Sequence, residues 1–362
     1  MAANPRAAAV AALVRQEQDG FSNLVLDAEL KRQQLEGRDK AFASAIFYTV
    51  LEHRGTLDYI LCQFLPKGLA KLDAPVREIL RAALAQARYM QVPVSAAVNE
   101  AVKLTRAFKK SSASGLVNAV LRKVAQNKSN LPPLPEGNIA RLSVAYSHPQ
   151  WLVKKLVSLL GTEEAEAFLR IDNEASPISV QVNPLKTNEK ALVDELRGEG
   201  VCVTPHPWVP GCLELSGTGD LTTLSAFYNG RFTVQDAAAH LIVCAADFAR
   251  GQRVLDVCAA PGGKSFAAAF AMENEGSILS CDLHENKLKR IREGAQRLGI
   301  TCIETAAVDG RAFREEWAGK FDVVICDVPC SGLGIIRKKP DIRYKDAQEF
   351  SALPEIQRLR EE

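Results

Sequence analysis

The sequence has no run of apolar residues that approaches the roughly 18 needed to cross a lipid bilayer. Its first residues, MAANPRAAAVAALVRQEQ, lack the charged region and the small-residue cleavage site of a secretory signal peptide. They predict instead the start of a helix, with Asn4 as the N-cap and Pro5 at the first helical position. We therefore expect a cytoplasmic protein without a membrane span.

Cysteine spacing that would suit a zinc site is also lacking. The nine cysteines are odd in number, and none belongs to a CxxC pair or to a Cys/His pattern typical of metal binding. This indicates free thiols in a reducing compartment, most of them small core residues, and predicts no metal. Cys258 and Cys330 are exceptions, because they lie in the two motifs that carry chemistry.

Length and charge indicate more than one domain. A chain of 362 residues exceeds what a single core normally holds, so two or three domains are expected. The net charge of +2 is unevenly distributed: residues 1–130 hold 19 basic against 11 acidic residues, and residues 131–362 hold 26 against 32. A basic module joined to a mildly acidic one indicates a polyanionic partner, although a solvated helical surface would show the same excess.

Residues 1–130 are predicted to form an all-helical domain. Apolar residues recur at intervals of three and four in FASAIFYTVLEHRGTLDYIL and VREILRAALAQARYM, and no strand-like alternation is present. A basic cluster follows Glu100 with no acidic residue to offset it, and we predict that it contacts phosphates. Its members are Lys103, Arg106, Lys109, Lys110, Arg122, Lys123 and Lys128. The segment QNKSNLPPLPEGN then predicts a linker.

Residues 131–230 are predicted to form a small α+β module. SHPQWLVKKLVSLLG is typical of a short helix ended by Gly161, and SPISVQVNPLKT alternates like a strand. KALVDELRGEG predicts a second helix, and VCVTPHPWVPGCLEL predicts extended chain.

From residue 231 to residue 362, short apolar strands alternate with helices. The predicted strands are RVLDVCAA, GSILSCDL, ITCIETAAVD and FDVVICDVPC, and the helices between the first three are PGGKSFAAAFAM and ENKLKRIREGAQRLG. Such alternation implies βαβ units and a Rossmann-like parallel sheet that binds ligands at the carboxyl ends of its strands. The fold class predicted for the whole chain is therefore multidomain, with an α/β domain behind the helical one.

The strongest local signal is VLDVCAAPGGKS. A buried strand brings Asp256 to its carboxyl end, and the small residues of the following turn let backbone N–H groups approach a ligand. A phosphate-binding P-loop would need GxxxxGK[ST] and a dinucleotide site would need GxGxxG, and this turn has neither.

Two further aspartates support a nucleoside site. Asp282 ends the second predicted strand, where a carboxylate can accept both ribose hydroxyls, and Asp309 follows the third strand near an adenine edge. A lone aspartate at a strand end is more often a helix cap. Three at the ends of successive strands favour a nucleoside, and the missing pyrophosphate loop favours S-adenosylmethionine over NAD.

The fourth predicted strand leads into Asp327, Pro329 and Cys330. Carbon-5 of cytosine is a poor nucleophile, but addition of a thiolate to carbon-6 gives an enamine that can attack a methyl sulfonium. A thiol and an acid are the groups that this chemistry requires. For Cys330 alone, the alternative is a buried cysteine beside a capping aspartate. The basic stretch that follows suits a nucleic-acid backbone or a solvated loop: Arg337, Lys338, Lys339, Arg343 and Lys345.

These motifs resemble the bacterial RNA 5-methylcytosine methyltransferases, in their ribosomal small-subunit (RsmB, Sun or Fmu) branch. The matching motifs are VLDVCAAPGGKS, CDLHENKLKRIREGAQRLG, VDGR, DVPCSGLG and RKKPDIRY, with weaker matches in SHPQWLV, VQVNPLKT and FTVQDAAAHL. The helical domain resembles the NusB antitermination fold in VPVSAAVNEAVKL and GLVNAVLRKV. The resemblance therefore covers essentially the whole chain.

The resemblance implies S-adenosylmethionine-dependent methylation of one cytosine of 16S ribosomal RNA at carbon-5, with transfer RNA as the alternative substrate. It also implies which residues contact the cofactor: Cys258, Ala259, Ala260, Pro261, Gly262, Gly263, Lys264, Asp282, Asp309 and Asp327.

By the same resemblance Cys330 assists product release, and the attacking cysteine lies in a later Thr-Cys motif. No such motif lies between Cys330 and Glu362, and Thr301-Cys302 opens the third strand at the opposite edge of the sheet. We therefore expect a methyltransferase domain truncated at its C-terminus. The chain would be either a fragment of an active enzyme or a non-catalytic RNA-binding protein, inactive as it stands.

Overall fold

The computed structural model describes residues 4–19, 22–127, 132–312 and 314–361. Its elements group into two compact units. The helical unit comprises Met1–Ala175 and Gly332–Glu349, and the sheet unit comprises Ser176–Ser331 and Phe350–Glu362. The two units therefore divide the module predicted for residues 131–230, because its first helices pack with the helical domain.

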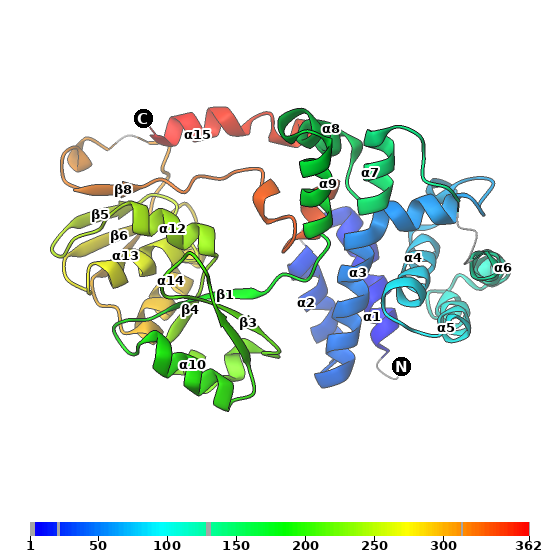
Figure 1. Cartoon of the computed structure of the whole chain (residues 1–362), viewed down its shortest axis with the longest axis horizontal. Helices are drawn as coiled ribbons and strands as arrows, with labels where there is room; N and C mark the ends of the chain where they lie inside the picture. Colours follow the sequence, from blue (N-terminus) through cyan, green and yellow to red (C-terminus); the bar gives the residue numbers. More distant parts are fainter. Residues whose placement is uncertain (1–3, 20–21, 128–131, 313, 362) are drawn as a thin grey trace. The chain divides into compact units, whose positions relative to one another are not determined.

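The helical unit follows the predicted helical pattern (Figure 1). Its helices are α1 (Pro5–Asp19), α2 (Ser22–Arg32), α3 (Gly37–Cys62), α4 (Ala74–Tyr89), α5 (Val94–Ala107), α6 (Ser114–Gln126), α7 (Asn138–Tyr146), α8 (Gln150–Leu160) and α9 (Thr162–Ile171), with 3-10 turns at Leu69–Lys71, Ser111–Ala113, Leu333–Ile335, Pro340–Tyr344 and Ala347–Phe350. Helix α1 starts as predicted, because Asn4 Oδ1 accepts hydrogen bonds from the backbone N–H groups of Arg6 (3.0 Å) and Ala7 (3.2 Å). Among the described helices, none combines the length and apolar character that crossing a membrane would require.

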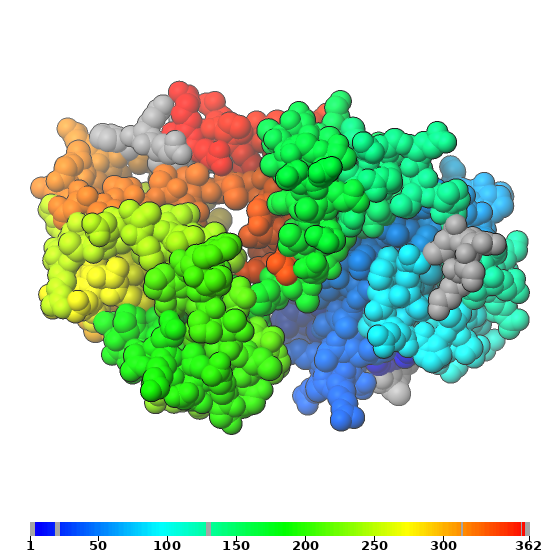
Figure 2. All heavy atoms as spheres, viewed as in Figure 1, coloured from blue at the N-terminus to red at the C-terminus, as the bar shows by residue number. Residues whose placement is uncertain are grey.

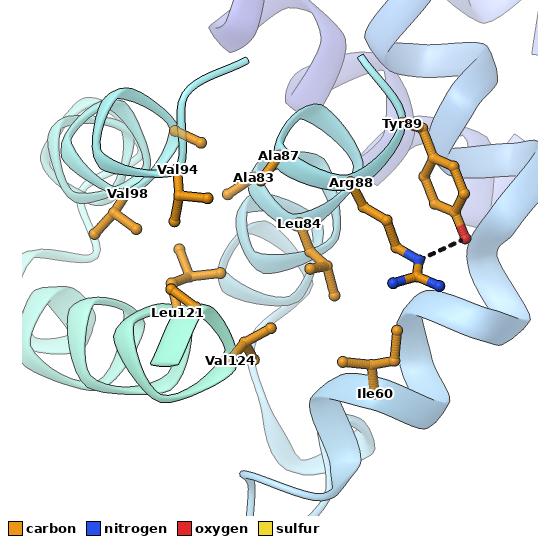
Figure 3. Close-up of a pocket in the computed structure, with 12 residues that line it drawn as sticks. Ile60, Ala83, Leu84, Ala87, Arg88, Tyr89, Val94, Val98, Leu121 and Val124 are labelled. Atoms are coloured by element: carbon orange, nitrogen blue, oxygen red, sulfur yellow. Dashed lines mark hydrogen bonds between the residues drawn. The ribbon is translucent and has the colours of Figure 1, made fainter. Parts of the chain in front are cut away.

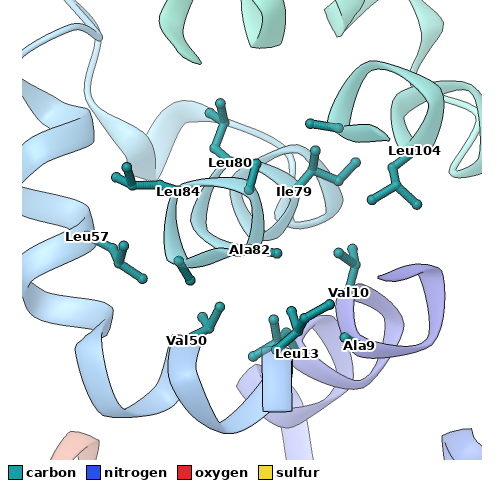
Figure 4. Close-up of a cluster of buried hydrophobic side chains, with 14 of the residues drawn as sticks. Ala9, Val10, Leu13, Val50, Leu57, Ile79, Leu80, Ala82, Leu84 and Leu104 are labelled. Atoms are coloured by element: carbon teal, nitrogen blue, oxygen red, sulfur yellow. The ribbon is translucent and has the colours of Figure 1, made fainter. Parts of the chain in front are cut away.

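The apolar spacing of the sequence explains how these helices pack. Val10 and Leu13 of α1, Leu57 of α3 and Ile79 and Leu80 of α4 are buried together (Figure 4). Because helical positions three and four apart share a face, each helix turns one apolar stripe toward this core.

A smaller hydrophobic cluster lies between α7, α8 and α9 of the helical unit. Leu142, Val153 and Leu169 are buried in its centre. Helices α8 and α9 lie on the face seen in Figure 2. Leu159 of α8 is 70% exposed. As predicted, Gly161 ends α8, and its φ of +83° favours glycine.

The first sheet of the sheet unit is antiparallel, in the order β2-β3-β1-β4. Val180 pairs with Leu213 and with Val234. The segment VCVTPHPWVPGCLEL, predicted only as extended, forms two strands joined by a loop. The elements are β1 (Ile178–Val182), α10 (Glu189–Gly198), β2 (Cys202–Pro205), β3 (Cys212–Ser216), a 3-10 turn at Leu221–Thr223, α11 (Ser225–Tyr228) and β4 (Phe232–Val234).

The second sheet is parallel and confirms the predicted α/β class. Its order is β7-β6-β5-β8, so the chain steps outward from β5 to β7 and returns on the other side of β5. In such sheets ligands bind where the order reverses, here between β5 and β8. The elements are α12 (Ala237–Ala245), β5 (Arg253–Asp256), α13 (Gly263–Ala271), β6 (Ser277–Asp282), α14 (Glu285–Leu298), β7 (Ile303–Ala307), a 3-10 turn at Glu315–Trp317, β8 (Val323–Ile325) and α15 (Leu353–Glu361).

Candidate active site

Four aspartates gather at the carboxyl edge of the parallel sheet. Asp256 and Asp282 end β5 and β6, and Asp309 and Asp327 follow β7 and β8 by two residues. Backbone hydrogen bonds join the loops at this edge: Ala259 N–H to the Cys281 carbonyl (2.7 Å), Val308 N–H to the Asp282 carbonyl (3.0 Å) and Val257 N–H to the Ile325 carbonyl (3.0 Å). Parallel strands bring residues far apart in sequence to one site.

The loop from Cys258 to Lys264 curves tightly into α13. Gly262 is the N-cap of that helix with φ +112°, and a Cβ there would lie 2.5 Å from the Phe266 ring. Glycine is therefore required at this position. The first N–H groups of a helix have no partner within the helix, so this turn presents donors and a positive dipole to a ligand.

A buried polar chain lies beneath the loop. Ser265 Oγ donates to Asp256 Oδ2 (2.7 Å), and Ser280 Oγ donates to Ser265 Oγ (2.8 Å). Burial raises the pKa of Asp256 to about 6, against the opposing effect of the Ser265 hydrogen bond. Burial also raises the pKa of the neighbouring Cys281 to about 12, so that thiol stays protonated and unreactive at neutral pH.

Asp282 and Asp309 each close a local turn. Asp282 Oδ1 accepts the N–H of His284 (3.0 Å) and lies 3.2 Å from Lys287 Nζ. Asp309 Oδ1 accepts the N–H of Arg311 (3.0 Å), and the Arg311 guanidinium binds both of its oxygens. The turn-forming role and a role in ligand binding are compatible, because each carboxylate has about four acceptor sites.

An ion pair joins the loop from Cys258 to Lys264 to the DVPC motif. Lys264 Nζ lies 2.5 Å from Asp327 Oδ2, and the lysine side chain is 17% exposed against 54% for the aspartate. Both residues line a cavity of about 180 Å³ between α12, α13 and β8, together with Ile242 and Phe248. Cys330, three residues further on, is exposed.

The basic stretch after Cys330 differs from the prediction. Arg343 is 0% exposed: its Nη1 donates to the Glu52 carbonyl (2.9 Å) and to Asn173 Oδ1 (2.6 Å), and its Nη2 donates to the Asp172 carbonyl (2.8 Å). The prediction that Arg343 contacts RNA is therefore wrong, because no phosphate can reach it. Ile342 beside it belongs to an apolar cluster with Leu152, which holds the segment within the helical unit.

The other cations of this stretch differ in their surroundings. Arg337 is partly buried and donates to the carbonyls of Glu174 (3.1 Å) and Ala175 (2.6 Å), where it satisfies acceptors that follow α9. Lys338 and Lys339 are exposed.

The basic cluster of α5 and α6 is partly neutralised. Lys103 Nζ lies 2.7 Å from Glu100, and Lys110 Nζ lies 2.7 Å from Asp73, the residue before α4, which is distant in sequence. The remaining cations are exposed at Arg106, Lys109, Arg122 and Lys123, and Lys128 lies outside the described residues.

The helical unit also contains an apolar cavity of about 250 Å³ (Figure 3). Val94, Leu121 and Val124 are among its lining residues, and Arg88 is the one charged residue among the described ones that line it. Arg88 Nε donates to Tyr89 Oη (3.3 Å). The groups that could recognise a nucleoside and react are at the sheet edge and not in this cavity.

Comparison with known families covers most of the chain. Residues 3–126 match the NusB family, residues 148–222 match the RsmF/B-like ferredoxin-like domain, and residues 243–360 match the family described as 16S rRNA methyltransferase RsmB/F. The solved structure of PH0851 is similar to the chain with a TM-score of 0.80 and 27% identity, over 99% of this chain and 82% of that one.

Curated relatives are similar over nearly the whole chain. The Bacillus subtilis protein named "Probable ribosomal RNA small subunit methyltransferase B" is 35% identical over 96% of this chain and 78% of its own length. The Vibrio cholerae ribosomal RNA small subunit methyltransferase B is 33% identical over 98% of this chain and 81% of its own length. The chain therefore belongs to the ribosomal RNA small subunit methyltransferase B family of S-adenosylmethionine-dependent enzymes.

Proposed function

We propose that the protein methylates carbon-5 of a cytosine in 16S ribosomal RNA. The observation that carries this proposal is the position of the DVPC motif directly after β8, with Asp327 bound to Lys264 of the cofactor loop. A methyl donor held by the loop would then lie beside an acid and a thiol, the groups that carbon-5 chemistry needs.

The residues of the loop fit S-adenosylmethionine. Gly262 packs against the Phe266 ring with a positive φ, so the turn is tight and no side chain at this position covers the backbone N–H groups at the start of α13. We assign the residues from Cys258 to Lys264 to the amino-acid end of the cofactor, Asp282 to the ribose hydroxyls and Asp309 to the adenine edge. When bound, the cofactor supplies an electrophilic methyl group.

The protein's own residues would act on the cytosine ring. A thiolate adds to carbon-6, carbon-5 takes the methyl group, and loss of the carbon-5 proton with expulsion of the thiol restores the aromatic ring. We assign Asp327 to the N3 side of the ring, where it would stabilise the adduct, and Cys330 to the release step.

RNA would meet the helical unit through its exposed cations. Arg106, Lys109, Arg122 and Lys123 are the residues that we propose for phosphate contacts, with Lys338 and Lys339 beyond the DVPC motif. Lys103 and Lys110 would contribute less, since each already has a carboxylate partner.

The test is a methyl-transfer assay with labelled cofactor, followed by digestion of the RNA to nucleosides. Unmodified 16S RNA and transfer RNA are the two substrates, and the proteins are this chain, its Cys330→Ala variant and the Bacillus subtilis relative. We expect label in 5-methylcytidine of 16S RNA and none in transfer RNA. Label in another nucleoside would contradict the carbon-5 assignment. Turnover by the chain that is lost in Cys330→Ala would make Cys330 the attacking thiol.

A further inference from the structure

Small side chains create the apolar cavity of the helical unit. The cavity has a volume of about 250 Å³ and is lined by residues of α3, α4, α5 and α6. Four of the lining residues are alanines: Ala83, Ala87, Ala97 and Ala125. Because residues four apart share a helix face, Ala83 and Ala87 leave a space beside α4 that larger side chains would fill.

The lining of the cavity suits an apolar occupant better than water. Except for Arg88 and Tyr89, the described residues that line it are all aliphatic. A buried water needs roughly two to four polar partners, and an apolar cavity of about 150 Å³ in another protein stays dry and takes up benzene. A cavity of about 250 Å³ therefore fits an apolar group larger than benzene.

Arg88 adds one positive charge to this apolar lining. Figure 3 shows its guanidinium beside the Tyr89 hydroxyl, on the side of the space where Ile60 lies. Its Nε donates to Tyr89 Oη (3.3 Å), and among the described residues no carboxylate forms an ion pair with it. The Tyr89 ring stacks on His53, with 3.7 Å between the ring centroids. Burial, Arg343 and Arg88 lower the pKa of His53 to about 4, so this imidazole is neutral and Arg88 supplies the charge.

We propose that this cavity binds an aliphatic monocarboxylate of about eight to ten carbons, with its carboxylate on Arg88 and its chain among the aliphatic side chains. A guanidinium binds a carboxylate through two parallel N–H···O hydrogen bonds, which suits a cation without an acidic partner. The chain length follows from the volume: about 150 Å³ holds the six carbons of benzene, so about 250 Å³ holds roughly eight to ten. The site is separate from the methyltransferase site and does not depend on the function proposed above.

The experiment is calorimetry on the whole chain with butanoate, hexanoate, octanoate and dodecanoate. We expect affinity to rise about threefold to fourfold with each methylene up to octanoate, because each methylene leaves water. Dodecanoate should gain little more, because its chain exceeds the cavity. Octan-1-ol has the same chain without the charge, so it should bind about tenfold more weakly than octanoate.

Variants separate the charge from the cavity. Arg88→Gln should lower the affinity for octanoate about tenfold, to that of octan-1-ol, and leave octan-1-ol within about twofold. Ala87→Leu fills the space and should abolish binding of both probes. Ala125→Met fills it from α6 with a flexible side chain, so the test does not depend on the folding of one variant. Arg38→Gln is the matched control, since Arg38 of α3 is exposed and is not among the lining residues. It should bind both probes like the parent.

Three results would overturn the inference. The absence of saturable binding with every carboxylate of the series would mean that the cavity closes in solution. Equal affinity for octanoate in Arg88→Gln and the parent would show that Arg88 does not bind the carboxylate. Tighter binding of N-acetyl-leucyl-leucine than of octanoate would assign the cavity to the chain end of a partner protein.

Discussion

Two buried carboxylates, one in each unit, have different surroundings. Glu78 in the helical unit is 0% exposed and contacts Arg81, which also binds Asp58 through two hydrogen bonds of 2.7 Å. Asp256 in the sheet unit is 1% exposed, and its Oδ2 accepts a hydrogen bond from the hydroxyl of Ser265. Burial raises the pKa of both groups. Arg81 contacts the first carboxylate, whose Oε2 has no hydrogen-bond partner among the described residues, and a hydroxyl binds the second.

The difference between these surroundings distinguishes charged groups that stabilise the fold from charged groups that can bind a ligand. In the helical unit, Arg77 and Arg81 outweigh the effect of burial on Glu17 and lower its pKa to about 2, which is typical of a closed ion-pair network. At the sheet edge, burial raises the pKa of Asp256, and the Ser265 hydroxyl, Lys264 and the Cys258 backbone do not outweigh it. Removing the cation from a buried ion pair is strongly destabilising, whereas a buried acid with a raised pKa at a sheet edge is a candidate for a functional site.

The largest effect, on stability, should come from breaking the ion-pair network around Arg81. Arg81→Met removes the cation nearest to the buried Glu78 and leaves Arg77 at 3.9 Å, so we expect a loss of about 3–5 kcal/mol in the stability of the helical unit. Hydrogen exchange of α1, α3 and α4 measures it. Arg88→Met on the same helix is the control and should change little. A loss below about 1 kcal/mol for Arg81→Met would show that the network is not structural.

Asp256 should respond to pH in the direction expected of an unpaired buried acid. Its folded pKa of about 6 lies above the unfolded value, so the folded state holds a proton that the unfolded chain loses. Stability should therefore fall as pH rises from about 4 to about 6, by up to about 3 kcal/mol. Asp256→Asn should remove this dependence in urea unfolding at a series of pH values. The same slope in parent and variant would place the titration elsewhere.

Asp282 tests the ribose end of the site. Asp282→Ala removes a charged acceptor, so we expect a loss of about 1.5–3 kcal/mol in binding of S-adenosylhomocysteine. Calorimetry measures this. Glu285→Ala, three residues on and paired with Arg292 (3.1 Å), is the matched control. Equal affinity in Asp282→Ala and the parent would refute the ribose assignment.

The smallest effects should come from single surface charges. Arg106→Gln with Lys109→Gln removes two exposed cations and should reduce the salt dependence of binding to single-stranded RNA by about 1.4 in the slope of log affinity against log salt. Lys103→Gln should change the slope less, because Glu100 already partners Lys103. Binding measured by filter assay between low and moderate salt decides this. An unchanged slope in the double variant would show that Arg106 and Lys109 do not contact RNA.

The sequence was sufficient for the elements of the parallel sheet and for the residues at its edge. Apolar patterning predicts the strands that end at Asp256 and Asp282. Small residues within one short motif predict the glycine turn into α13. Local chemistry of this kind is readable because the residues that define it are neighbours in the chain.

Only the tertiary structure determined which groups pair with the charged and polar side chains. RKKPDIRY is basic in sequence, yet packing buries Arg343 under carbonyls supplied by Glu52 and Asp172, far away in the chain. Lys110 was predicted to be free for phosphates, but Asp73 neutralises it. Gln235 lies in FTVQDAAAHL, one of the weaker family matches, and the folded chain brings its side-chain Nε2 to the Gly263 carbonyl. Patterning fixes which face of an element is buried, whereas electrostatic and hydrogen-bond partners are set by contacts between segments that only the folded chain brings together.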